Sequence, residues 1–313
     1  MQNTSPGSPV SLSGRELLAA LGIVVIWGTN FIAMKIGLRN FTPFQLGAAR
    51  YVCATLPLIL LVRAPRLQWK WLLLYGLFQG VGQFGLLFVS LRIGMTAALA
   101  SVLMQTQLFF TALFSFIVLA EKPGRPLFVG LALAALGLCC FALNYALPAA
   151  GAAAATTALG FVLCLGAASM WAGSNIVVRL AQRSAPDFDP LSFLVWCSAV
   201  PVLPFILLSL LFDPSATRWQ WTAAPWQGWL AIAYLGWVAT IFAYSMWTSL
   251  IKRHGANKVA PFSLAVPVVG LSSGMLLLGE HVTAWQWAGT GLVVAALACV
   301  LMGTRVAARS LGR

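Results

Sequence analysis

The sequence predicts an all-α integral membrane protein of ten transmembrane helices, arranged as two inverted five-helix repeats with both termini cytoplasmic. Three observations lead to this prediction: an apolar composition, ten apolar segments of spanning length, and an internal repeat. Of the 313 residues, 60% are hydrophobic and only 8% are charged, whereas soluble domains carry about 25% charged residues. This composition is typical of a chain that lies mostly within a bilayer.

Ten apolar segments each approach the roughly 20 residues that a helix needs to cross the hydrocarbon core. They are too long for barrel strands, and they do not alternate in polarity as such strands do. No small-x-small cleavage site follows the first segment, so no cleavable signal peptide is expected. The predicted helices cover approximately residues 16–36, 42–62, 69–91, 95–119, 126–145, 157–179, 189–211, 226–250, 256–278 and 283–304.

The distribution of Lys and Arg predicts the orientation in the membrane. With the N-terminus inside, four basic residues lie on the outer side (Lys35, Arg39, Arg92 and Arg218), Arg50 lies within a span, and all others lie on the inner side. Inner segments of membrane proteins carry an excess of such residues. The net charge of +13 does not indicate a nucleic-acid partner, because the basic residues stand singly at the ends of apolar segments.

An internal repeat divides the chain into two halves. The segment Leu21–Lys35 recurs 144 residues later as Leu165–Arg179, and Trp27 matches Trp171. Because each half holds five helices, the second half enters the membrane from the opposite side, a plan common in secondary transporters with a substrate site near the midplane. The predicted units are a tail at 1–15, a repeat at 16–147, an alanine-rich linker at 148–156, a repeat at 157–304 and a tail at 305–313.

The positions of the acidic, histidine and cysteine residues argue against catalysis. All six acids and both histidines lie at the predicted span ends or in loops, and the six cysteines have no zinc-ligand spacing. An embedded enzyme needs a nucleophile–base pair or a ligand cluster, so we expect neither an enzyme nor a cofactor or metal. A proton relay through a mid-membrane carboxylate is not expected either.

Uncharged polar residues within the spans are the candidate substrate ligands. In hydrocarbon they are costly unless satisfied, so they should face the bundle interior or a wet cavity. One interpretation is a cavity whose amides bind a zwitterion between aromatic side chains; the alternative is that they join helices, which we favour for Gln107, about 200° around the helix from Gln105. The candidate substrate-binding residues are Trp27, Asn30, Arg50, Gln79, Gln83, Gln105, Trp171, Asn175 and Tyr244.

Arg50 lies eight residues into its span, roughly 12 Å deep at 1.5 Å per residue. An arginine at that depth costs several kcal/mol unless it is paired or hydrated. It could anchor a substrate carboxylate or bind backbone carbonyls at a broken helix end, and the sequence alone favours the second role.

Prolines within two spans are candidate gating positions, because an internal proline removes a helix hydrogen bond and permits a kink. They are Pro201, Pro204, Pro261 and Pro267. Two GxxxG motifs, Gly76–Gly80 and Gly270–Gly274, predict close helix approach within the bundle, with dimerisation as the alternative.

Several motifs resemble those of the EamA family in the drug/metabolite transporter superfamily. They are Trp27-Gly-Thr-Asn-Phe31, Ala48-Ala-Arg50-Tyr51, Leu119-Ala-Glu121-Lys122, Leu278-Gly-Glu280-His281 and Pro267-Val-Val-Gly270. The last is similar to the ninth span of bacterial exporters of cysteine and related amino acids, and exporters of the YddG type belong to the same group. The resemblance implies ten helices in two inverted repeats, in a bacterial inner-membrane carrier that exports amino acids or related metabolites.

We therefore expect an exporter of small zwitterions, broad in specificity, working by alternating access. A drug or other metabolite carrier is the nearest alternative, followed by a nucleotide-sugar antiporter, which should need several cavity cations for the diphosphate. The expected partners are the small-molecule substrate and membrane lipid, and the sequence leaves monomer and homodimer open.

Overall fold

The computed structural model describes residues 13–121, 125–146, 157–185, 187–254 and 259–311, and every regular element within these ranges is helical. Eight of the described helices are long and apolar enough to cross a membrane, and two shorter apolar helices cover Phe262–Leu278 and Ala284–Val300. The predicted linker and most of the predicted N-terminal tail lie outside the described residues.

The first half contains five helical rods, three of which change helix type or break. They are α1 (Gly14–Gly37); α2 (Pro43–Thr55) with α3 (Leu58–Leu61); α4 (Trp69–Tyr75), π-helical η1 (Gly76–Phe84) and α5 (Gly85–Arg92); α6 (Ala97–Leu103), 3₁₀-helical η2 (Met104–Thr106) and α7 (Gln107–Leu119); and α8 (Arg125–Ala146).

The second half repeats this series with the same irregularities. It contains α9 (Ala158–Ser184); α10 (Pro190–Ala199) with α11 (Val202–Phe212); the short η3 (Gln220–Ala223); α12 (Trp226–Ala233), π-helical η4 (Tyr234–Phe242) and α13 (Ala243–His254); 3₁₀-helical η5 (Ala260–Leu264) with α15 (Ala265–Leu278); and α16 (Ala284–Leu311).

Capping residues and prolines mark the first turns of several helices, where the sequence changes from polar to apolar. Ser13 and Glu16 form a capping box at α1, and Thr42 with Gln45 forms one at α2. Such boxes satisfy amide groups that have no partner within the helix. Both α2 and α10 begin with a proline at the first helical position, where its missing N–H costs nothing.

Glycines set the closest helix contacts in the bundle. A Cβ on Gly28 of α1 would lie 2.5 Å from a Val269 side-chain carbon of α15, and one on Gly80 would lie 1.9 Å from Pro201. A Cβ on Gly270 would lie 2.4 Å from Ser101. The described GxxxG faces are thus occupied by helices of the same chain, as the packing interpretation requires.

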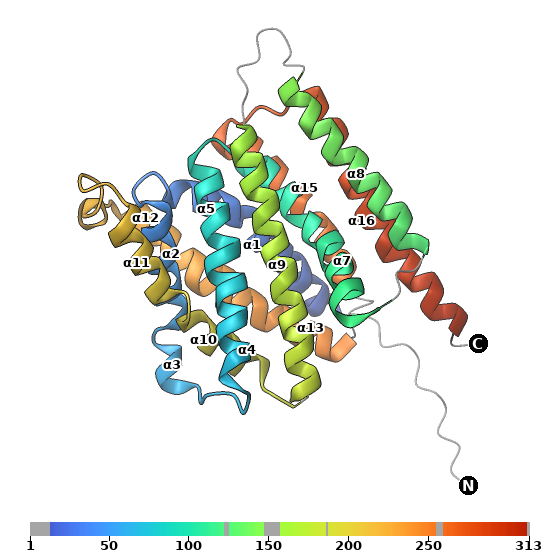
Figure 1. The fold of residues 1–313 in the computed structure, drawn as a ribbon, viewed down its shortest axis with the longest axis horizontal. Coiled ribbons are helices and arrows are strands. Elements are labelled where there is room, and N and C mark those ends of the chain that lie inside the picture. Colours follow the sequence, from blue (N-terminus) through green and yellow to red (C-terminus); the bar gives the residue numbers. More distant parts are fainter. Residues whose placement is uncertain (1–12, 122–124, 147–156, 186, 255–258, 312–313) are drawn as a thin grey trace.

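Helices α8 and α16 form a separate pair at one edge of the bundle (Figure 1). They approach closely because glycines lie between them: a Cβ on Gly137 would be 3.0 Å from the Gly289 carbonyl, and one on Gly289 would be 2.8 Å from Phe141. Helix α1 lies against α15, α12 and α13, and α9 lies against α5 and α7.

Candidate substrate site

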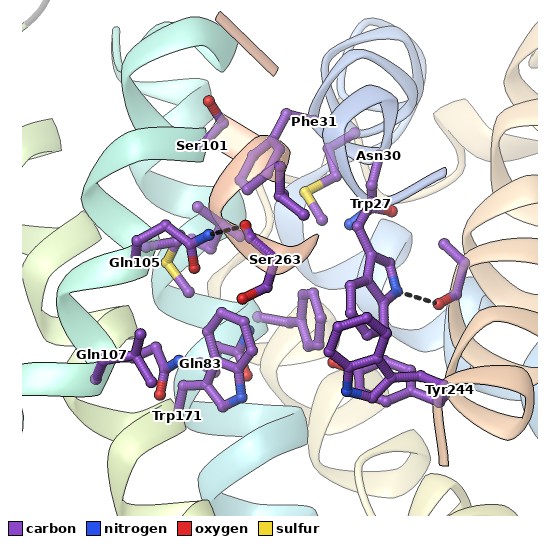
Figure 2. Close-up of a pocket in the computed structure, with 18 of the residues that line it drawn as sticks. Trp27, Asn30, Phe31, Gln83, Ser101, Gln105, Gln107, Trp171, Tyr244 and Ser263 are labelled. Carbon is purple, nitrogen blue, oxygen red and sulfur yellow. Dashed lines mark hydrogen bonds between the residues drawn. The ribbon is translucent and has the colours of Figure 1, made fainter. Parts of the chain in front are cut away.

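A central cavity of about 300 Å³ lies between helices of the two halves. Its lining side chains come from α1, α2, η1, η2, α7, α9 and α13 as well as η5, so neither half forms it alone. Eight of the nine predicted substrate-binding residues line it, several of them seen in Figure 2: Trp27, Asn30, Arg50, Gln83, Gln105, Trp171, Asn175 and Tyr244.

Aromatic rings form one wall of the cavity. The Trp27 ring lies 5.0 Å from that of Tyr244 and 5.2 Å from that of Trp247, measured between centroids. Its indole Nε1 donates to the Ala239 carbonyl at 3.2 Å, which holds α1 against the π-helical part of the second half. Trp171 lies across the cavity from these rings (Figure 2). Sequence reasoning missed Trp247, which follows Tyr244 by three residues on the same helix face.

Arg50 is the most deeply buried charged residue of the cavity, with 1% of its surface exposed. Its Nη2 donates to Thr240 Oγ1 at 3.0 Å, and its Cζ lies 3.8 Å from the centroid of the Phe84 ring. Its Nε and Nη1 have no hydrogen-bond partner. No described bond joins Arg50 to a backbone carbonyl, so the role that the sequence favoured, binding a broken helix end, has no contact to support it.

Two amide oxygens of the cavity also lack partners. Asn30 Oδ1 and Gln83 Oε1 are both buried without a hydrogen bond. Gln105 differs, because its Nε2 donates to the Ser263 carbonyl at 3.1 Å and so joins η2 to η5 across the cavity (Figure 2). The cavity therefore combines unpaired donors on Arg50 with unpaired acceptors on two amides.

Asn175, which lies one turn after Trp171, has a different environment from Asn30. Asn175 Nδ2 donates to Gln107 Oε1 at 2.9 Å and to Thr111 Oγ1 at 3.1 Å, which ties α9 to α7. Gln107 thus joins helices, yet it also lines the cavity together with Gln105. The expected 200° separation of the two glutamines assumed a regular α-helix, and the 3₁₀ turn of η2 between them changes that angle.

Gln79 is the one predicted ligand that lies outside the central cavity. Its Oε1 accepts a hydrogen bond from Ser174 Oγ at 2.5 Å, and it lines a separate space of about 20 Å³ behind Arg50. The prediction placed Gln79 and Gln83 on one face of an α-helix. Both lie in π-helical η1, but only Gln83 lines the central cavity, while Gln79 binds Ser174 of α9.

The predicted gating prolines lie at or near irregular points of their helices. Pro201 separates α10 from α11, and Pro204 lies in the first turn of α11. Pro267 is buried in α15, and its carbonyl lies 3.5 Å from Ser101 Oγ. Pro261 lies in η5, with its side chain outside the described part of the structure.

Among the residues that the structure describes, no carboxylate, histidine or cysteine lines the central cavity. Within the described ranges, no three His, Cys, Asp or Glu residues gather as a potential metal site. The chemistry available to a ligand in this cavity is therefore one cation, several amides and hydroxyls, and aromatic rings.

Comparison with known proteins agrees with this geometry. The sequence model of the EamA-like transporter family matches residues 14–143 and again 158–302. A protein of Salmonella typhimurium named "Probable amino-acid metabolite efflux pump" is 37% identical over 94% of this chain and 97% of its own length. A protein of Escherichia coli K12 with the same name is 35% identical, with the same coverage of both chains.

A solved crystal structure with 19% sequence identity superimposes with a TM-score of 0.59, covering 93% of this chain and 98% of that one. At this identity the likeness concerns the fold alone. The family match covers both halves and most of the chain, and the relatives extend over nearly its whole length. The chain therefore belongs to the EamA-like transporter family and is a multi-pass efflux transporter of the bacterial inner membrane.

Proposed function

We propose that this chain exports amino acids or closely related small zwitterionic metabolites, with broad specificity, by alternating access of the central cavity. The observation that carries the proposal is the set of unpaired groups in that cavity. Arg50 offers two buried N–H groups, while Asn30 and Gln83 each offer a buried amide oxygen. Buried polar groups are rarely left unpaired in proteins, so these groups point to a ligand with both charges.

A free amino acid carries the complementary groups. Its carboxylate accepts the parallel hydrogen bonds that a guanidinium presents, and its ammonium donates to amide oxygens. The rings of Trp27, Trp171 and Tyr244 would then surround the side chain, with cation–π attraction available to the ammonium. The cavity volume of about 300 Å³ suits a small metabolite.

Larger or differently charged substrates fit less well. Arg50 is the only cation among the described residues that line the central cavity, whereas a nucleotide sugar should need several for its diphosphate. A cationic drug would favour a carboxylate, and the described lining of the cavity contains none. The named function of the two bacterial relatives, efflux of amino-acid metabolites, supports the same substrate class.

The proposed mechanism uses no mid-membrane carboxylate as a proton relay, because the acidic residues lie at the predicted span ends or in loops. Substrate would move down its own gradient or couple to protons only near the membrane surface. Bending at Pro201, Pro204, Pro261 and Pro267 would let the helices open one side and then the other. The inverted arrangement of ten spans and the cytoplasmic placement of both termini are part of this proposal.

The test is uptake into proteoliposomes of labelled amino acids, each compared with its α-amide, which lacks the carboxylate. We expect wild-type protein to favour the acid, and Arg50→Gln to lower uptake of the acid by about 10- to 100-fold, the worth of a charge-assisted pair. Uptake of the amide should change little, because its neutral carboxamide gains no charge-assisted bond from the guanidinium.

Arg63→Gln is the matched control, because Arg63 is exposed in a loop and lies away from the cavity. If Arg50→Gln reduced uptake of acid and amide equally, Arg50 would be structural. If wild-type vesicles showed no saturable uptake of any amino acid, the proposed substrate class would be wrong.

A further inference from the structure

The fourth helix of each half ends in the same way. Ala120 and Gly279 adopt left-handed conformations, with φ of 54° and 65°, and a glutamate follows each. The backbone N–H of Glu121 and that of Glu280 each donate to a carbonyl six residues earlier, at 3.3 and 3.2 Å. This C-terminal cap holds both carboxylates in comparable places, one at each end of the molecule under the predicted orientation.

At the predicted outer end, Glu280 binds the start of a helix from the other half. Its Oε1 accepts from the Ala97 N–H and its Oε2 from the Ala98 N–H, both at 2.8 Å. Ala97 begins α6, so the carboxylate satisfies amides that have no partner within the helix and lies at the positive end of its dipole. This contact joins the end of α15 to the start of α6.

Basic side chains lie beside Glu280 without binding it. A cavity of about 330 Å³ at this end is lined by Glu280, Lys35, Arg39 and Arg92. Lys35 Nζ donates instead to the Leu91 carbonyl at 3.1 Å. Within the described ranges, no ion pair joins Glu280 to any of these cations.

At the predicted inner end, the equivalent glutamate is Glu121, and its partners are arginine side chains. Glu121 Oε2 lies 2.6 Å from Arg179 Nη1, and its Oε1 lies 3.7 Å from Arg183 Nη2. Arg179 and Arg183 follow Lys35 and Arg39 by 144 residues, the spacing of the Trp27 repeat. Each end of the molecule therefore carries a capped glutamate from one half facing two basic residues from the other half, and within the described ranges only Glu121 is paired with them.

We infer that Glu280 is the latch of the outer gate, held on the amides of Ala97 and Ala98 when that gate is closed and transferred to Lys35 and Arg39 when it opens. The pairing of Glu121 shows the released form of the same device. Exchanging two amide bonds for an ion pair keeps the carboxylate satisfied in both states, so neither state is strongly favoured, as a carrier requires. This inference rests on the proposed alternating-access function.

The experiment measures access to a buried reporter from outside. Met34 lines the central cavity and has 0% of its surface exposed, so a cysteine there reacts with a membrane-impermeant maleimide only when the outer gate opens. In intact cells without added substrate, we expect Met34→Cys/Glu280→Gln to label on the order of tenfold faster than Met34→Cys alone, since the neutral amide loses charge-assisted bonds.

A second variant tests whether the basic residues bind Glu280 when the outer gate opens. Arg39→Gln removes a cation that is exposed in the closed state, so we expect the reporter to label several-fold more slowly. His281→Gln, next to Glu280 and exposed, should label at the parental rate, and protein without the Met34 substitution gives the background from the native cysteines.

Parental labelling of the Glu280 variant would overturn the latch, and an unchanged rate in Arg39→Gln would overturn the transfer to the basic residues. If the Glu280 variant does not reach the membrane, the Arg39 result decides. Labelling needs no substrate, so its result is independent of amino-acid uptake. If the variants label at the predicted rates but the protein takes up no amino acid, the latch is supported and the substrate class is rejected. If the protein takes up amino acids but the labelling rates are unaltered in the variants, the substrate class is supported and the latch is rejected.

Discussion

At the residue scale, the buried polar side chains of the cavity are of two kinds. Arg50 and Asn30 have unpaired atoms that a ligand could bind, whereas Asn175 joins helices of the bundle. A buried guanidinium is costly unless its N–H groups are satisfied, and Arg50 is supported by one hydroxyl and the face of Phe84. Asn30 leaves its oxygen unpaired, whereas Asn175 donates twice to α7. The asparagines that lie one turn after Trp27 and Trp171 thus have different environments.

This difference predicts different outcomes for the same substitution. Asn30→Ala should raise the KM for amino acids several-fold and leave the melting temperature nearly unchanged, because no described bond of its oxygen is lost. Asn175→Ala should destabilise the fold by about 1–2 kcal/mol, the worth of buried hydrogen bonds. Thermal unfolding in detergent and proteoliposome uptake measure the two effects. Equal losses of stability in both variants would contradict the assignment.

The sequence could predict those features of the candidate site that depend on residue type and on regular helix geometry. Polar groups in an apolar span must face the interior of the helix bundle. In agreement with this, the cavity is lined by Trp27, Asn30, Trp171 and Asn175. The position of Gln79 was not predictable, because its partner Ser174 lies on a helix of the other half. Nor does the sequence show that Asn175 finds partners in Gln107 and Thr111 while Asn30 Oδ1 finds none, since this depends on distant packing.

At the scale of the element, the third rod of each half departs from α-helix over nine residues, in η1 and η4. The apolar segments predicted both rods to within a few residues, but they did not predict this change. In η1, Gly76 and Gly80 lie against Val200 and Pro201 from elsewhere in the chain. Such π-helical segments often occur at functional sites, and here η1 presents Gln83 to the cavity.

The contact between η1 and Pro201 predicts a stability effect at Gly80. Gly80→Ala should lower the melting temperature, because its Cβ would lie 1.9 Å from a Pro201 ring carbon and force the helices apart; overpacking of this kind costs about 1–3 kcal/mol. Gly22→Ala is the control, since nothing lies within 4 Å of its Cβ and alanine favours the helix. A Gly80 variant as stable as wild type would contradict the close packing.

At the scale of the whole molecule, the predicted orientation follows from charge, and the number of spans decides the side of the C-terminus. The prediction of ten spans places both ends in the cytoplasm, while the structure gives eight long helices and two shorter apolar ones. Hydropathy locates the spans, and the predicted sidedness follows from which loops carry Lys and Arg.

Reporter fusions test this orientation. Green fluorescent protein fused after Arg313 should fluoresce, and alkaline phosphatase fused there should be inactive, because the first folds in the cytoplasm and the second needs the periplasm for its disulfides. Phosphatase fused after Ala216, in the predicted outer loop between the seventh and eighth spans, should be active. An active phosphatase at the C-terminus would require an odd number of spans or the opposite orientation.

The pairing of α8 with α16 has a consequence for the synthesis of the protein. Helix α8 closes the first half, yet its principal partner is the last helix of the chain, and the surface around Gly130 and Gly137 is shaped to receive that helix. During translation α8 must therefore remain in contact with lipid until the ribosome has made α16. The first half cannot complete its packing alone, and assembly of the carrier waits for the final span to insert.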